Sequence, residues 1–121
     1  MSIFDILSFV IIRGDAVAPS DYKSQKLNKN EAKKHIRFVL SKYPDSVWFS
    51  KHSLEELEKD DLATVDALNV LKSPDAMICD DGELERGSYR YRIETANIVV
   101  VVAFSCDGRS LTIVTAWDKR K

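Results

Sequence analysis

The chain has 121 residues, a length that suits one domain with its own hydrophobic core. Hydrophobic residues make up 45% and charged residues 31% of it, as in ordinary globular proteins, and its two cysteines, Cys79 and Cys106, lack CxxC spacing. The composition therefore indicates a reducing compartment, which we take to be the cytoplasm, with small buried thiols and no zinc site.

Charge is distributed unevenly along the chain, although the net charge is −1. Residues 1–42 carry 8 Lys or Arg against 4 Asp or Glu (+4), residues 43–85 carry 3 against 12 (−9), and residues 86–121 carry 7 against 3 (+4). The near-neutral total does not indicate a nucleic-acid-binding protein, but the two basic ends can still form a positive patch. The acidic middle is also consistent with solvated helix faces.

Residues 1–27 are expected to precede the folded domain as an apolar element and a linker. The apolar run from Ile6 to Ile12 has no basic region before it and is shorter than the about 20 residues that span a membrane. We therefore expect neither a signal peptide nor a membrane segment. The element can instead pack on the domain, contact a partner or drive homo-oligomerisation through its apolar side chains, Ile3, Phe4, Leu7 and Val10.

The domain itself is predicted at residues 28–121 and begins with a helix. Asn28 or Asn30 can cap this helix, because a side-chain oxygen at the N-cap accepts a hydrogen bond from a free backbone N–H group. The apolar stripe continues to about Tyr43, and Pro44 stops the helix. The short run "SVWFS" that follows is typical of a β-strand.

Two more helices are expected next. The capping box "SLEE", which begins at Ser53, starts the second helix and turns Leu54 and Leu57 inward. The third helix opens at Asp61 or Thr64 and ends at "KSP". Three of its positions are predicted to be buried: Val65, Leu68 and Leu71.

The second half of the domain has the pattern of an antiparallel sheet. Residues 83–86 can form a short returning arm, and residues 89–94 alternate like a strand with one face in the core. Residues 98–104 are apolar at every position, which predicts a central strand, and the Asp-Gly turn at 107–108 leads into a last strand at 111–117. The sequence thus predicts an α+β fold, with two to three helices packed on a small antiparallel β-sheet.

The alternating strand carries the first functional signal. Its period of two places Arg90 and Arg92 together on one face and the tyrosines on the other. Guanidinium groups bind phosphate oxygens through two hydrogen bonds, so the pair is a candidate phosphate grip. Cross-strand salt bridges are the structural alternative. Three glutamates could provide them: Glu83, Glu85 and Glu94.

Two further segments carry candidate functional residues. His52 follows Lys51 at a strand-to-helix junction, where helix amides bind anions and a histidine can transfer protons; a capping or surface role is the alternative. In "TAWDKRK", Trp117 and the basic tail suit stacking on a base and gripping its backbone, while a core tryptophan with a solubilising tail is the alternative. We find no nucleotide-binding, hydrolase or metal-site motif, and we predict neither a cofactor nor a metal.

This succession of elements resembles the compact toxins of bacterial toxin–antitoxin modules. The segments "SVWFSKHSLEEL", "LKSPDAM", "YRYRIE", "VVVVAF" and "TIVTAW" are most similar to the MqsR-type branch of the RelE-like superfamily and its uncharacterised relatives. The resemblance covers about residues 28–121. It implies a metal-independent endoribonuclease (an mRNA interferase) that attacks a phosphate with the adjacent 2′-hydroxyl, often on the ribosome, and is neutralised by a cognate antitoxin.

The resemblance also assigns roles to residues. The catalytic group that it implies comprises His52, Arg90, Arg92 and Lys119. The candidate substrate-binding residues are Lys51, Tyr91, Trp117 and Arg120, of which Lys51 and Trp117 come from the residue patterns described above. His52 would be the general acid or base and the cations would stabilise the phosphate, whereas Tyr91 would face outward only through a bulge. Related sequences often carry a basic residue where Glu55 and Glu56 stand here, and a carboxylate there could orient His52.

A second function remains open. The same sheet face would serve a non-catalytic protein-binding module, such as an inactive relative or an immunity-type protein. The near-neutral net charge and the acidic middle of the chain favour this alternative.

Overall fold

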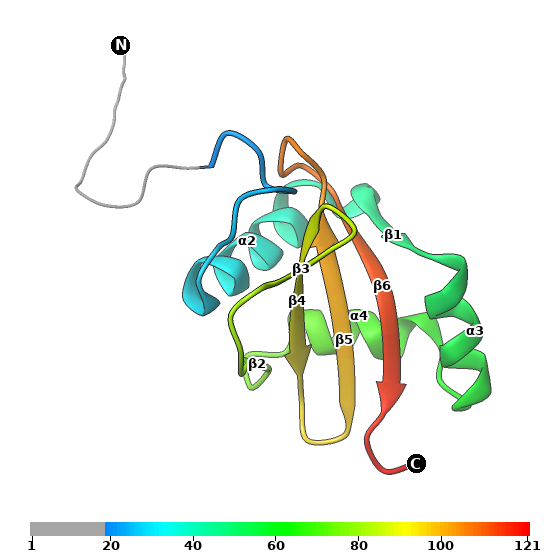
Figure 1. Cartoon of the computed structure of the whole chain (residues 1–121). Helices are drawn as coiled ribbons and strands as arrows, with labels where there is room; N and C mark the ends of the chain where they lie inside the picture. The colour runs from blue at the N-terminus through cyan, green and yellow to red at the C-terminus, as the bar shows by residue number, and fades with distance from the viewer. Residues whose placement is uncertain (1–18) are drawn as a thin grey trace.

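The computed structural model describes residues 19–121, so the predicted apolar element at residues 3–12 lies outside the described residues (Figure 1). Within the described part, three α-helices cover one face of a six-stranded, mostly antiparallel sheet, which confirms the predicted α+β fold. The helices are α2 (Lys29–Lys42), α3 (Lys51–Lys59) and α4 (Thr64–Lys72), and a short 3-10 turn, Pro44–Ser46, follows α2.

The sheet has the order β1-β6-β5-β4-β2, and β3 pairs with the other half of β4. Its strands are β1 (Val47–Phe49), β2 (Met77–Ile78), β3 (Glu83–Glu85), β4 (Ser88–Glu94), β5 (Ile98–Phe104) and β6 (Leu111–Asp118). β5 is central, as predicted. The sheet is larger than a hairpin meander because β1 adds to the edge of β6 in parallel, while the remaining pairs are antiparallel.

The helix boundaries follow from their caps. Asn28 caps α2 as predicted: its side chain accepts a hydrogen bond from the Glu31 N–H at 2.9 Å, and the Glu31 carboxylate accepts one from the Asn28 N–H at 2.9 Å. The predicted cap at Ser53 is wrong. Ser50 caps α3 instead, with its Oγ accepting from the Ser53 N–H at 3.0 Å, so Ser53 lies buried in the first turn and Leu54 faces solvent.

The hydrophobic core lies between the sheet and the helices. The buried side chains of α4 are Ala67, Val70 and Leu71, spaced to lie on one helix face, whereas the predicted Val65 is 54% exposed. The expectation of buried thiols is also wrong, because Cys79 and Cys106 are free and exposed in loops.

Residues 20–27 are packed on the domain, although the sequence predicted a linker there. The Lys23 carbonyl accepts a hydrogen bond from the Tyr89 N–H at 2.8 Å, next to the sheet edge. Leu27 is buried, and its N–H donates to the Tyr91 hydroxyl at 2.9 Å. The packed domain therefore begins before residue 28.

His35 helps to hold this segment in place. Its ring stacks on Tyr22 with 4.2 Å between ring centres, and its Nε2 lies 2.7 Å from the carbonyl oxygen of Gly108 in the β5–β6 hairpin. Burial lowers the pKa of His35 below its usual value. His35 thus joins α2, the hairpin and residues 20–27, a structural role.

Tyr91→Phe should destabilise the protein by roughly 1–3 kcal/mol, because it leaves the buried Leu27 N–H without an acceptor. Urea unfolding followed by circular dichroism measures this free energy. Tyr89→Phe, in the same strand but only half-buried, is the matched control. Equal unfolding free energies for the two variants would show that the Tyr91 hydroxyl does not anchor residues 20–27.

Candidate functional site

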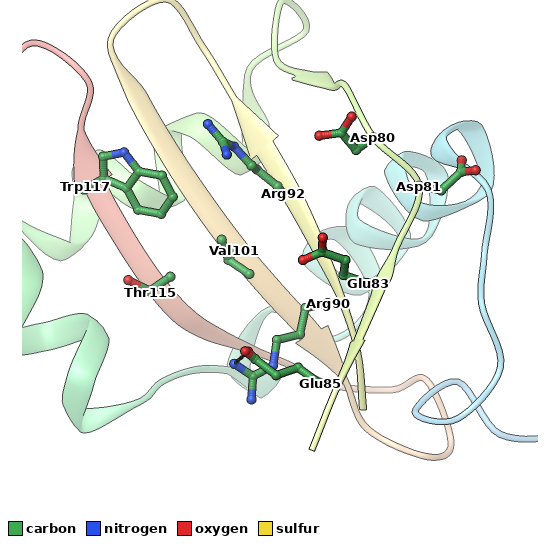
Figure 2. A pocket seen from close by; sticks show the side chains of 9 residues that line it. All are labelled: Asp80, Asp81, Glu83, Glu85, Arg90, Arg92, Val101, Thr115 and Trp117. Atoms are coloured by element: carbon green, nitrogen blue, oxygen red, sulfur yellow. Dashed lines mark hydrogen bonds and ion pairs between the residues drawn. The ribbon is translucent and has the colours of Figure 1, made fainter. Parts of the chain in front are cut away.

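The predicted arginines lie on the sheet face that the helices leave uncovered, which we call the open face. Arg92 pairs across the sheet with Val101, and Val101 pairs with Thr115, while Arg90 pairs with Ala103. Figure 2 shows Arg90, Arg92 and Val101 projecting from this side of β4 and β5. The predicted alternation of β4 is confirmed, because Tyr91 between the two arginines is buried in the core.

A hollow with a volume of about 280 Å³ lies on the open face over β4, β5 and β6. Its lining residues are Asp80, Asp81, Glu83, Glu85, Arg90, Arg92, Val101, Thr115 and Trp117 (Figure 2). Four acidic residues and two arginines thus line the hollow. The hollow is a site of mixed charge with an acidic rim, a feature that the sequence analysis missed because the rim comes from the loop before β3 and from β3 itself.

Both arginines form salt bridges. Arg90 Nη1 lies 2.8 Å from Glu85 Oε1, and Arg92 Nε lies 3.1 Å from Glu94 Oε2. Lys119 Nζ approaches the other oxygen of Glu94 at 2.9 Å, and this ammonium, more than Arg92, lowers the pKa of Glu94. Both sequence-based expectations for Arg90 and Arg92 are therefore met. The two arginines lie on the same face of the sheet, and each forms a salt bridge with a glutamate.

The arginine pair also has contacts and donors beyond these salt bridges. The guanidinium carbon of Arg92 lies 5.3 Å from the centre of the Trp117 ring, which is a cation–π distance. Trp117 is half-buried on the open face, so it does not belong to the core. The Nε of Arg90 is buried and has no hydrogen-bond partner among the described residues.

His52 and Lys51 lie apart from the arginines. Both are exposed in the first turn of α3, directly after β1. Because β1 lies three strand positions from β4, about 14 Å separates the two strands. The structure therefore divides the predicted catalytic residues into two groups, with Arg90, Arg92 and Lys119 near β4 and His52 on α3, beyond the β1 edge of the sheet.

Two of the predicted substrate-binding residues, Tyr91 and Arg120, do not line the hollow on the open face. Tyr91 is 1% exposed on the core side of β4, so its prediction as a substrate-binding residue is wrong. The irregularity of the sheet lies in the β5–β6 pairing and does not turn Tyr91 outward. The Arg120 side chain donates two hydrogen bonds to Asp118, at 3.0 Å from Nε and 2.9 Å from Nη2.

Sequence reasoning also missed Trp48. It lies in β1 opposite Thr112 and is 59% exposed, whereas its neighbours Val47 and Phe49 pack against the core. The sequence "VWF" could have predicted this exposure. Side chains alternate along a strand, so the middle residue faces away from the core when its two neighbours face toward it.

The fold and the open face define a small α+β domain with one uncovered sheet surface of mixed charge and exposed tryptophan. Residues 49–118 match the model of the family described as Domain of unknown function (DUF4258). The chain belongs to this family, and the matched region includes both the arginine strand and His52. Neither the curated proteins nor the solved structures yielded a match.

Within residues 19–121, no helix is long and apolar enough to cross a membrane. The same residues contain no group of three or more His, Cys, Asp or Glu side chains that could hold a metal ion.

Asp118 should make the fold sensitive to acid. Hydrogen bonds from Arg120 lower the pKa of the Asp118 carboxyl from 3.8 to about 2. Because the folded-state pKa lies below the unfolded value, this stabilisation is present above about pH 4 and is lost as the pH falls through about 2. Asp118→Asn should therefore lower the melting temperature at pH 5 and flatten its decline toward pH 2. Calorimetry tests this, with the exposed Asp75→Asn as control, and an unchanged pH profile for Asp118→Asn would contradict the assignment.

Proposed function

We propose that the open face binds single-stranded RNA and that the protein is a metal-independent endoribonuclease of the toxin type. The observation that carries this proposal is the pair Arg90 and Arg92 in register on an uncovered sheet face, with Trp117 beside Arg92. Guanidinium groups suit phosphate oxygens, and an aromatic ring next to them suits a stacked base. The cytoplasm, mRNA and a cognate antitoxin are the setting that the toxin resemblance adds.

The salt bridges on the open face are compatible with phosphate binding. Partly exposed ion pairs contribute only about 0–1 kcal/mol, so a phosphate that accepts two hydrogen bonds can displace a carboxylate. The side chains of Arg90 and Arg92 are 24% and 48% exposed, so both guanidinium groups are accessible to a ligand. The glutamates then hold the guanidinium groups in place until RNA arrives.

The proposed reaction is attack of a ribose 2′-hydroxyl on the adjacent phosphorus, with departure of the 5′-oxygen. It needs a base for the hydroxyl proton, an acid for the leaving oxygen and cations for the phosphorane. His52 is the candidate for one proton transfer, with Lys51 and the α3 amides as a local positive field. Because His52 and Arg92 lie on opposite sides of β5 and β6, they would act on different phosphates: Arg90 and Arg92 would hold a phosphate further along the strand, while Lys51 and the α3 amides would stabilise the phosphorane beside His52.

The acidic rim favours a second candidate function. Asp80, Asp81, Glu83 and Glu85 outnumber the two arginines in the hollow and repel a polyanion, whereas they attract lysine and arginine side chains. A non-catalytic module that binds a basic protein segment would use the same face.

Purified wild-type protein should cleave a labelled single-stranded RNA in the presence of EDTA and leave 2′,3′-cyclic phosphate ends. His52→Ala should slow cleavage by roughly 100-fold or more, because it removes a proton-transfer group, whereas Arg92→Ala should chiefly raise the KM for RNA, because it removes a phosphate contact away from the cleaved bond. Arg37→Ala, an exposed arginine on α2, is the matched control. Intact RNA with folded wild-type protein would overturn the ribonuclease and leave the binding module.

Glu85→Gln should bind RNA up to about 5-fold more tightly at low salt, because it removes the carboxylate that competes for Arg90. Fluorescence anisotropy with a labelled RNA measures the change in Kd. Glu58→Gln removes the same charge from the exposed side of α3 and serves as the control. An equal gain in both variants would mean that net charge alone governs binding, which is contrary to a specific role for Arg90.

A further inference from the structure

We propose that Trp48 forms a nucleobase-binding subsite at the β1 edge of the open face, with Thr112 and Ala103 beside it. The inference rests on the proposed function, since it adds a base contact to the phosphate contacts of the arginines. It concerns a residue outside the predicted catalytic and substrate-binding groups.

The strand register places Trp48 in line with the arginine strand. Trp48 pairs with Thr112, Thr112 pairs with Ala103, and Ala103 pairs with Arg90. Residues that pair directly across strands share a face, so these four residues form one row across the open face. The row spans β1, β6, β5 and β4, over about 14 Å.

Trp48 is exposed enough for a ligand to contact its ring. Its side chain is 59% exposed in a three-residue edge strand, where it contributes little to the core. An exposed aromatic ring on an uncovered sheet face can serve as a stacking platform for a base. Between Trp48 and Arg90 the row holds only a methyl group and a small hydroxyl side chain, from Ala103 and Thr112.

The charges on the open face favour a base over a charged group at this position. The carboxylates of the acidic rim come from the loop before β3 and from β3, on the far side of β4. The row from Ala103 to Trp48 carries no charged residue. A flat neutral base can therefore stack on the indole, and the Thr112 hydroxyl can donate to or accept from its edge, while the phosphates remain near the arginines.

This subsite also gives RNA a path between the two separated groups of predicted residues. Trp48 lies in β1, and the chain leads from it directly through Ser50 into α3, where His52 lies in the first turn. An RNA strand held at Arg90 and stacked on Trp48 runs across β5 and β6 toward His52.

The test compares Trp48→Leu, which keeps an apolar side chain, with Trp48→Phe, which keeps an aromatic ring. Kd is measured by fluorescence anisotropy for a labelled oligouridylate of about eight nucleotides and for an abasic chain of the same length. Trp48→Leu should bind the oligouridylate roughly 5- to 100-fold more weakly than wild type, and Trp48→Phe within a few-fold of it. The abasic chain should bind all three proteins alike. Phe38→Leu, an exposed aromatic on α2, is the control, and thermal unfolding verifies that each variant is folded.

The outcomes separate this inference from the proposed function. If wild type and Trp48→Leu bind the oligouridylate equally, the subsite is wrong and RNA binding stands. If Trp48→Leu weakens the abasic chain to the same extent, Trp48 does not contact a base and the subsite is also wrong. If folded wild type binds neither chain, the proposed function fails. Binding of a polylysine peptide that weakens in Glu83→Gln would then assign this face to a protein partner.

Discussion

The open face depends on one constraint, the register of β4. Side chains of a strand alternate between its two faces, so a slip of one residue would turn both arginines into the core. Tyr91 prevents such a slip because its hydroxyl accepts the Leu27 N–H and its ring meets Phe104 with 5.5 Å between centres. Gly82 packs so closely that a Cβ there would lie 2.5 Å from the Tyr91 ring, which makes glycine necessary at this position. The outward direction of the arginines is thus determined from the core side.

The same register distributes charge over the open face. Pairing of β3 with β4 places Glu83 opposite Arg90 and brings Glu85 into its salt bridge, so the arginine strand has carboxylates on its outer side. On its inner side, β5 and β6 contribute only uncharged residues to the row that ends at Trp48. The face therefore changes from charged to neutral and aromatic in the direction of β1. The proposed phosphate contacts and base contacts would therefore be separated along that direction.

Local patterns predicted most of the fold. Asn28 and Pro44 bound the first helix, and the alternation of β4 and the continuous apolar run of β5 placed both strands correctly. The cap of α3 was mispredicted because Ser50 and Ser53 both fit a capping position. Tertiary structure decides between them: the Ser50 hydroxyl donates to the Val114 carbonyl at 2.8 Å, which fixes the chain where β1 passes into α3.

The candidate site was less predictable, because its geometry depends on contacts between distant segments. Residue spacing identified Arg90 and Arg92 as neighbours on one face, but no spacing reports that β1 adds in parallel to β6. That pairing separates His52 from the arginines and places Trp48 on their row. The acidic rim could not be predicted either, because the path of the loop between β2 and β3 places Asp80 and Asp81 at the hollow.

The strand order also determines what kind of substrate the face can serve. A reaction on a small molecule needs its acid, base and cations within hydrogen-bond reach of one another, and about 14 Å between β1 and β4 does not allow this for His52 and Arg92. An extended polymer can contact both groups at once, because its backbone can lie on the cations while its bases reach the tryptophans. A basic protein segment would instead gain most from the carboxylates at the β3 side and little from the neutral row. The row from Arg90 to Trp48 is therefore the part of the surface that most favours an RNA strand over a protein ligand.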